Sequence, residues 1–256
     1  MIEFALVFGA GLLAGMMNAL AGAGSFVTIP AMILVGVPAV QANASSTVAL
    51  LPGSLTSAWI YRDGLGPIGA VPIRLLLFVT LIGGMLGGFL LISTSTFIFD
   101  AILPWLLLLA LLVLIFGRHL GLRLRRHGHI GPTAILVAQF FLGAYGGYFG
   151  GGVGLMMMAS WTLLDNRDIK SLNAPRTFLV SAANAMAVLT FVFAGAVYWP
   201  ETLVMLFASI IGGYLGAQWG RRARPEVVRT GTIVLTAFIT LAFFIRAYGP
   251  GTFKFG

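Results

Sequence analysis

The chain contains long apolar segments that lack the polar face of a water-soluble helix. Two examples are Ile73–Ile92 and Ile102–Phe116, in which nearly every side chain is apolar or small. A helix needs about 20 predominantly apolar residues to cross the hydrocarbon core of a bilayer. Several segments approach this length, so the sequence predicts an all-α, polytopic membrane protein.

The composition excludes a large soluble domain. Only 9% of the residues are charged, where soluble domains carry about 25%. The 34 glycines are typical of closely packed membrane helices, because small residues let two backbones approach each other. The absence of cysteine excludes disulfides, thiol nucleophiles and cysteine metal sites.

The net charge of +8 comes largely from clustered arginines. The clusters are Arg118, Arg123, Arg125 and Arg126, and Arg221, Arg222, Arg224 and Arg229. Both stand at the ends of apolar segments, which is typical of cytoplasmic loops that meet anionic lipid. We therefore expect the lipid bilayer, and not nucleic acid, to be the partner of this charge.

An internal repeat organises the chain. A glycine-rich break at 21–25 is followed by an Asn-Ala-x-x-Thr motif at 43–47, and both features recur at 150–154 and 173–177 with nearly the same spacing. Two motifs in the same order at matched spacing indicate a duplication.

The duplication divides the chain into two transmembrane repeats. We predict a first repeat at 1–117, a basic cytoplasmic connector at 118–129 and a second repeat at 130–256. We predict five helical segments in each repeat. These are 4–20, 25–36, 43–61, 66–92 and 97–117 in the first repeat, and 130–149, 153–164, 173–197, 200–220 and 226–248 in the second.

The positions of basic loop residues indicate that the two repeats are inverted. In the first repeat the loop after the third segment carries Arg62, whereas the loop after the second carries no Lys or Arg. In the second repeat the loop after the second segment carries Arg167 and Lys170, and the loop after the third carries none. Because Lys and Arg favour cytoplasmic loops, we expect opposite orientations and both termini outside. Inverted repeats are a common plan of secondary transporters.

The second segment of each repeat is too short to span a membrane. About 12 residues make roughly 18 Å of helix, against a hydrocarbon core about 30 Å thick. We expect these short or re-entrant helices to begin near the middle of the membrane, each after its glycine break. Their N-termini then present unpaired N–H groups and a partial positive charge to one central region, which favours an anion.

Distinctive motifs occur at matched places in both repeats. They are Gly15–Ser25, Ala42–Ala44, Leu51–Ser54, Trp59 and Tyr61 in the first, and Gly147–Gly154, Asn173–Ala174 and Gly212–Gly216 in the second. Together they resemble the TauE/SafE family of membrane transporters, also called the sulfite exporter or TSUP family, over nearly the whole chain. The resemblance implies movement of sulfite, thiosulfate, sulfonates or related organosulfur anions across the bacterial cytoplasmic membrane.

The candidate substrate-binding residues lie at the glycine breaks and the repeated motif. They are Asn18, Gly22, Gly24, Ser25, Asn43, Ser46, Thr47, Gly150, Gly151, Gly152, Asn173, Arg176 and Thr177. A second set of polar residues in apolar surroundings is expected to line a polar path. Its members are Asn18, Ser25, Ser54, Gln139 and Asn184.

Each candidate also has a structural interpretation. Asn43 and Asn173 stand where helices are expected to open, so they either cap free N–H groups or contact the substrate. Thr47 and Thr177 either bond back to their own helix or face the substrate. Arg176, which replaces Ser46 of the first repeat, either clamps an oxyanion with its planar fork or snorkels to lipid headgroups.

These features together predict a secondary transporter for a small anion, a sulfur oxyanion or organosulfonate, that works by alternating access. An anion channel is the nearest alternative. A membrane-embedded enzyme is a further alternative, but the sequence offers no acid, base, nucleophile or metal cluster at membrane depth. No cofactor or metal site is expected.

Overall fold

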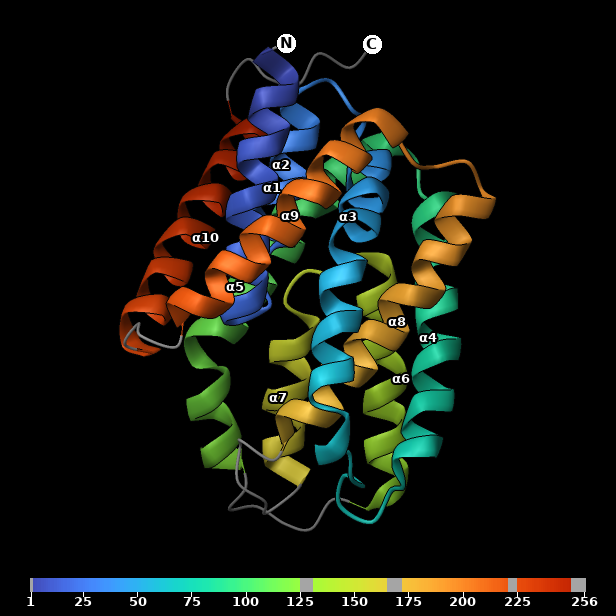
Figure 1. Cartoon of the computed structure of the whole chain (residues 1–256). Coiled ribbons are helices and arrows are strands. Elements are labelled where there is room, and N and C mark those ends of the chain that lie inside the picture. The colour runs from blue at the N-terminus through green and yellow to red at the C-terminus, as the bar shows by residue number, and fades with distance from the viewer. Residues whose placement is uncertain (1, 125–130, 165–171, 221–224, 250–256) are drawn as a thin grey trace.

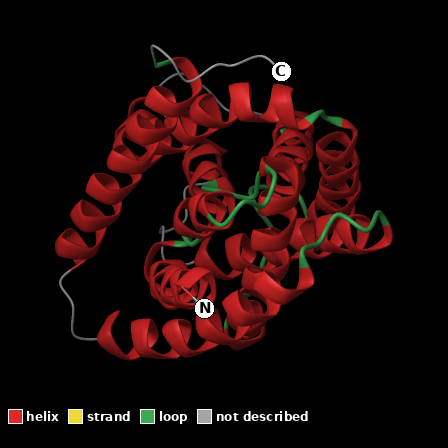
Figure 2. Ribbon diagram, turned by 90° about the horizontal axis from the view of Figure 1, so that it is seen from above, coloured by secondary structure: helices red, strands yellow, loops and turns green. Residues whose placement is uncertain are grey.

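The computed structural model describes residues 2–124, 131–164, 172–220 and 225–249. These residues form α-helices and one short 3₁₀ helix, with no strand among them (Figure 2). The first half contains α1 (Ile2–Ala21), α2 (Ser25–Leu34), α3 (Ala39–Ile60), η1 (Arg62–Gly64), α4 (Ile73–Ser93) and α5 (Thr96–Leu124). The second half contains α6 (Pro132–Tyr148), α7 (Val153–Leu164), α8 (Asn173–Phe193), α9 (Trp199–Gly220) and α10 (Pro225–Tyr248).

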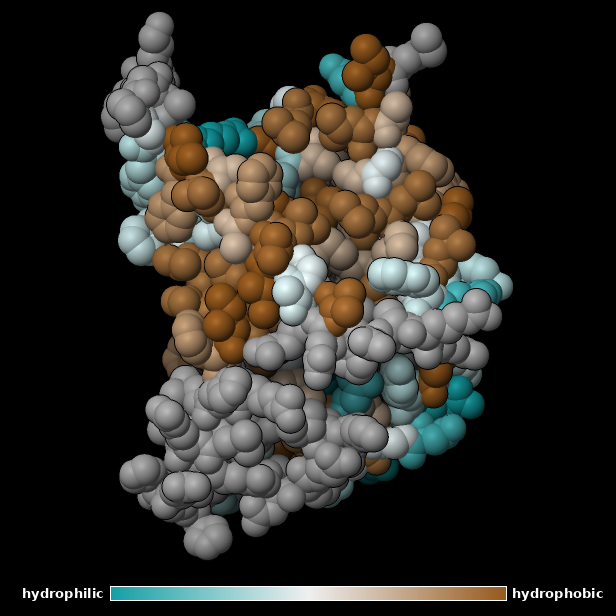
Figure 3. Space-filling model, turned by 90° about the vertical axis from the view of Figure 1, so that its left-hand side faces the viewer, coloured by the Kyte–Doolittle hydropathy of each residue, from teal (hydrophilic) through white to brown (hydrophobic). Residues whose placement is uncertain are grey.

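The expected all-α membrane architecture is confirmed. Five of the described helices are long and apolar enough to cross a bilayer, namely α1, α4, α5, α8 and α10. The outward face of α10 illustrates the pattern, because Val234, Phe238, Leu241 and Ile245 follow helical spacing and are all exposed. Figure 3 shows a broad apolar surface on this side of the molecule. Such a surface is suited to lipid rather than to water.

The expected helix boundaries hold best for the short helices. The segment predicted at 153–164 matches α7. The predicted start of the third helix at Asn43 is wrong, because α3 begins at Ala39, directly after Pro38. The fourth helix begins at Ile73 rather than 66, because Ile68 and Val71 pair in a tight bridge before it. The helix α5 continues to Leu124, and residues 125–129 of the basic connector lie outside the described residues.

Glycine pairs four residues apart set two close helix crossings. Helix α1 packs against α9, and a Cβ on Gly15 would lie 2.1 Å from the carbonyl oxygen of Ser209. Helix α4 packs against α6, and a Cβ on Gly87 would lie 2.0 Å from the carbonyl oxygen of Ala144. These crossings exclude any side chain, so the four helices meet backbone to backbone. Helices α3 and α8 then contact each other and also the two crossed pairs.

The short helices α2 and α7 both begin inside the molecule. Figure 1 shows that each starts near mid-height and runs to a different end of the bundle. At 10 and 12 residues, they extend roughly 15 and 18 Å at 1.5 Å per residue. Neither can cross a core about 30 Å thick. Their starts therefore lie inside the bundle, at the depth of the membrane core.

Candidate functional site

A cavity of about 810 Å³ lies where the starts of α2 and α7 approach α3 and α8. Its wall is made of polar and small residues together with a few apolar side chains. The lining residues are Asn18, Ala19, Leu20, Gly22, Ser25, Thr47, Leu50, Ser54, Ser57, Tyr61, Gly150, Val153, Gly154, Leu155, Met158, Asn173, Arg176, Thr177, Val180, Ser181 and Asn184. Both glycine breaks thus contribute to one space.

Left-handed glycines open the two breaks. Gly22 follows α1 with a φ of +67°, and Gly150 follows α6 with a φ of +75°. Side chains with a Cβ rarely adopt this conformation, so glycine is needed where the chain reverses. Each reversal ends one helix at the cavity and starts the next one there. The two glycine turns therefore place two helix N-termini at the same cavity.

These helix starts present unused N–H donors. In the described part of the chain, the N–H groups of Ser25, Val153 and Gly154 have no protein acceptor, and all three residues line the cavity. The first hydrogen bonds inside α2 and α7 use the carbonyls of Ala23, Gly24 and Gly152 as acceptors. Unpaired N–H groups and the helix dipole together favour a bound anion.

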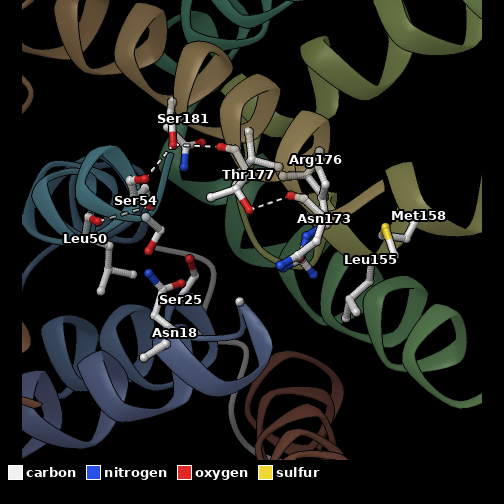
Figure 4. A pocket seen from close by; sticks show the side chains of 18 of the residues that line it. Asn18, Ser25, Leu50, Ser54, Leu155, Met158, Asn173, Arg176, Thr177 and Ser181 are labelled. Atoms are coloured by element: carbon white, nitrogen blue, oxygen red, sulfur yellow. Dashed lines mark hydrogen bonds between the residues drawn. The ribbon is translucent and has the colours of Figure 1, made fainter. Parts of the chain in front are cut away.

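Arg176 adds a positive charge to the same wall. It is the one charged residue among the described residues that line the cavity. Its aliphatic stem packs on α7, where a Cβ on Gly154 would lie 3.5 Å from the Arg176 Cδ. Figure 4 shows Arg176 and Asn173 projecting from α8 toward the space that Asn18 and Ser25 approach from the opposite side. An anion there would meet a guanidinium fork and two helix N-termini.

Most of the predicted substrate-binding residues lie at this cavity. The lining includes Asn18, Gly22, Ser25, Thr47, Gly150, Asn173, Arg176 and Thr177. The other predicted residues, which are Gly24, Asn43, Ser46, Gly151 and Gly152, do not belong to it.

The residues outside the lining have structural contacts instead. Gly24 allows a close approach, because a Cβ there would lie 2.8 Å from the carbonyl oxygen of Ala14. Ser46 shares a buried hydrogen bond with Thr28. Gly151 and Gly152 face Phe149 and Ala110, where a Cβ would lie 2.7 and 2.9 Å from the nearest side-chain carbon.

The two asparagines of the repeated motif are not helix caps. Asn43 lies one turn inside α3, where it is 1% exposed and its side-chain Nδ2 donates to the carbonyl of Tyr148 at 2.8 Å. Asn173 begins α8, but that helix has no side-chain cap hydrogen bond. The capping interpretation is therefore wrong for both residues. Asn173 instead faces the cavity.

The two threonines bond back to their own helices. The Thr47 hydroxyl donates to the Asn43 carbonyl at 2.9 Å, and the Thr177 hydroxyl donates to the Asn173 carbonyl at 2.8 Å. This confirms the structural interpretation. Each hydroxyl oxygen keeps its lone pairs, and both residues still line the cavity.

The expected polar path is partly confirmed. Asn18, Ser25, Ser54 and Asn184 line the cavity. Gln139 does not, because its amide is fully buried between the Thr80 hydroxyl and the Trp161 indole N–H.

Several lining residues on α3 and α8 were not predicted from the sequence. Ser181 is the clearest, since its hydroxyl donates to the carbonyl of Ser54, at 2.8 Å, and links the two helices. Ser57 and Val180 also line the cavity. Helical spacing was an available signal, because Ser181 lies one turn beyond Thr177 and Ser57 lies about one turn beyond Ser54.

Comparisons with known proteins agree on one class. The family model described as Sulfite exporter TauE/SafE matches residues 7–243. A probable membrane transporter protein of Haemophilus influenzae is 28% identical over 98% of this chain and 97% of its own length. The probable membrane transporter protein ORF9 of a Sinorhizobium species is 28% identical over 97% and 93%. The probable membrane transporter protein YfcA of Escherichia coli K12 is 25% identical over 95% and 90%. No solved structure matches the chain.

Proposed function

The chain belongs to the sulfite exporter TauE/SafE family, and we propose that it is a secondary transporter that moves a sulfur oxyanion or organosulfonate across the cytoplasmic membrane by alternating access. The family and the relatives are named as membrane transporters, so the chain is a multi-pass membrane transporter and not an enzyme. The substrate class and the mechanism are the proposed part.

The cavity wall carries the proposal for an anion. Arg176 and the N–H groups of Ser25, Val153 and Gly154 all offer hydrogen-bond donors to one space, and no carboxylate occurs among its described lining residues. Donors aligned in a low-dielectric site bind oxyanions well, because each N–H⁺ or N–H bond is made without competition from bulk water. The volume of about 810 Å³ is ample for a small sulfur anion and its hydration.

The pairing of helices supports two inverted repeats around this site. Helix α1 packs on α9 as its counterpart α6 packs on α4, and α3 contacts α9 as α8 contacts α4. The cavity lies between the halves and takes one helix start from each. Rocking of the bundle that contains α1 and α9 against the bundle that contains α4 and α6 then exposes the same anion site to each side in turn.

Transport into proteoliposomes tests the proposed function. We expect saturable uptake of at least one member of a panel containing sulfite, thiosulfate, taurine and sulfoacetate, with acetate and lactate as carboxylate controls. Unlabelled substrate on the far side should accelerate exchange of the labelled substrate, as a carrier requires. Flux that fails to saturate and shows no exchange would indicate a channel, and absence of transport for every sulfur anion would contradict the substrate class.

The inverted topology gives a second prediction, which the cysteine-free chain makes direct to test. We propose that both termini lie outside. Single cysteines at Ser95 and Ala194, both exposed after the ends of α4 and α8, should then react with an impermeant maleimide in intact cells. Cysteines at Asp63 and Gly131, exposed at the other end of the molecule, should react only after permeabilisation. Labelling of Asp63 and Ala194 from the same side would contradict inversion.

A further inference from the structure

Oxygen atoms converge beside Gly150 at the end of α6. The three heavy atoms nearest to the place that a Cβ would occupy are the Gly146 carbonyl oxygen at 3.5 Å, the Asn184 Oδ1 at 3.8 Å and the Thr47 Oγ1 at 3.8 Å. They come from α6, α8 and α3, and Gly150, Thr47 and Asn184 all line the cavity. The Thr47 hydroxyl already donates to the Asn43 carbonyl, so it offers only lone pairs here. This corner is therefore lined by acceptors.

Several of these acceptors lack a partner in the described part of the chain. The Asn184 Oδ1 is buried and accepts no hydrogen bond. The Gly146 carbonyl would accept from the Gly150 N–H in a continuing helix, but that N–H donates to the Tyr145 carbonyl instead. Close by on the chain, Asn43 is 1% exposed, and its Oδ1 is also unpartnered while its Nδ2 holds the Tyr148 carbonyl. Buried acceptors without partners are costly, so they need a water molecule or an ion as a partner.

The first glycine break has no such corner. A Cβ on Gly22, which has a similar backbone conformation, would meet nothing within 4 Å. The oxygen cluster is thus a feature of the second break and not a consequence of the left-handed turn. This difference between the two repeats suggests a task that only one of them performs.

Neutral oxygens at a helix C-terminus are suited to a monovalent cation. Divalent Ca²⁺ and Mg²⁺ rely on carboxylates, and none occurs among the described lining residues. The C-terminus of α6 adds a partial negative charge, and half-helix C-terminal ends coordinate Na⁺ in other secondary transporters. We propose that the Gly146 carbonyl, Asn184 and Thr47 form a Na⁺ site that couples cation and anion binding in one cavity.

The coupling follows from the position of Arg176. Its stem packs on Gly154, four residues along the chain from Gly150, so its charge shares the cavity with the proposed ion. Two positive charges without a carboxylate between them repel each other. An anion bound beside both removes that repulsion, so each ligand tightens the binding of the other by the same factor. The coupling rests on the proposed anion transport, whereas the Na⁺ site stands on the oxygen cluster alone.

Binding of radioactive sodium to the purified full-length protein in detergent tests the site. We expect saturable binding that unlabelled NaCl displaces and choline chloride does not. Gly150→Ala puts a methyl group among the three oxygens and should weaken sodium binding at least about tenfold. The matched control is Gly36→Ala. Gly36 also has a positive φ, of +89°, but it lies outside the cavity and nothing is within 4 Å of its Cβ position. This control should bind sodium like the unaltered protein.

A second pair of variants guards against a folding effect at the glycine. Thr47→Val removes the proposed ligand and should weaken sodium binding about tenfold. Thr56→Val removes the same kind of back-bonded hydroxyl from an exposed position of the same helix and should have no effect. Absence of saturable sodium binding, or equal binding by Thr47→Val and Thr56→Val, would overturn the proposal.

The sodium result and the proposed function can fail separately. Arg176→Gln should keep or increase sodium affinity, because it removes a neighbouring positive charge, while anion binding falls. Anion transport that proceeds unchanged in choline medium would overturn the sodium proposal and leave the anion transporter intact. Sodium binding in a protein that transports no panel anion would overturn the proposed substrate class and leave the cation site.

Discussion

Replacement of Gly22 by leucine should reduce anion uptake by at least about tenfold in a protein that still folds and inserts. Gly22 lines the cavity, and its Cβ position has nothing within 4 Å, so a leucine side chain extends into the space before the start of α2. We expect it to block access to the N–H group of Ser25, which is a proposed anion ligand. The measurement is initial uptake into proteoliposomes, normalised to the amount of reconstituted protein.

Backbone strain is the competing explanation for such a loss. The φ of +67° at Gly22 disfavours any side chain, at a cost of order 1–3 kcal/mol. Gly36→Leu is the matched control, because Gly36 has a φ of +89° and equally open surroundings in the exposed loop after α2. Equal losses of uptake in both variants would attribute the effect to strain and remove Gly22 from the anion path.

The helices were largely predictable from the sequence, because a segment that crosses a bilayer must be apolar over a minimum length. Apolar length located the helices, and the paired glycine breaks located the starts of α2 and α7. The start of α3 was missed because asparagine is a good helix cap in isolation. In the fold, the Asn43 side chain instead reaches the Tyr148 carbonyl, 105 residues along the chain. A contact of that range has no signature in a single sequence.

The candidate site was predicted at the level of motifs and only partly at the level of residues. Three consecutive glycines begin the second break, and of these only Gly150 lines the cavity, whereas Gly151 and Gly152 face Phe149 and Ala110. Which glycine faces inward depends on the path of the turn, including the positive φ of Gly150 and Gly152. Composition does not determine that path. Ser181 was missed for a similar reason, because its position at the cavity depends on the packing of α8 against Ser54 of α3.

Arg176→Gln should weaken anion binding about tenfold to hundredfold, because a charge-assisted hydrogen bond contributes roughly 1.5–3 kcal/mol. Arg176 lines the cavity and forms no ion pair with any described residue, so its donors are available to the substrate. Arg176→Lys should lose less, since it keeps the charge but not the planar fork. The measurement is equilibrium binding of labelled sulfite or thiosulfate to purified protein in detergent.

The snorkelling alternative predicts a different pattern for the same residue. A headgroup anchor would be replaced almost fully by lysine, and glutamine would lower the yield of inserted protein without changing the affinity of what remains. Arg74→Gln supplies the comparison, because Arg74 is exposed in the first turn of α4 and lies outside the cavity. Its affinity for the anion should match that of the unaltered protein. Affinity retained in a well-folded Arg176→Gln variant would leave the helix starts at Ser25 and Val153 as the anion-binding groups, because no other described residue lining the cavity carries a charge.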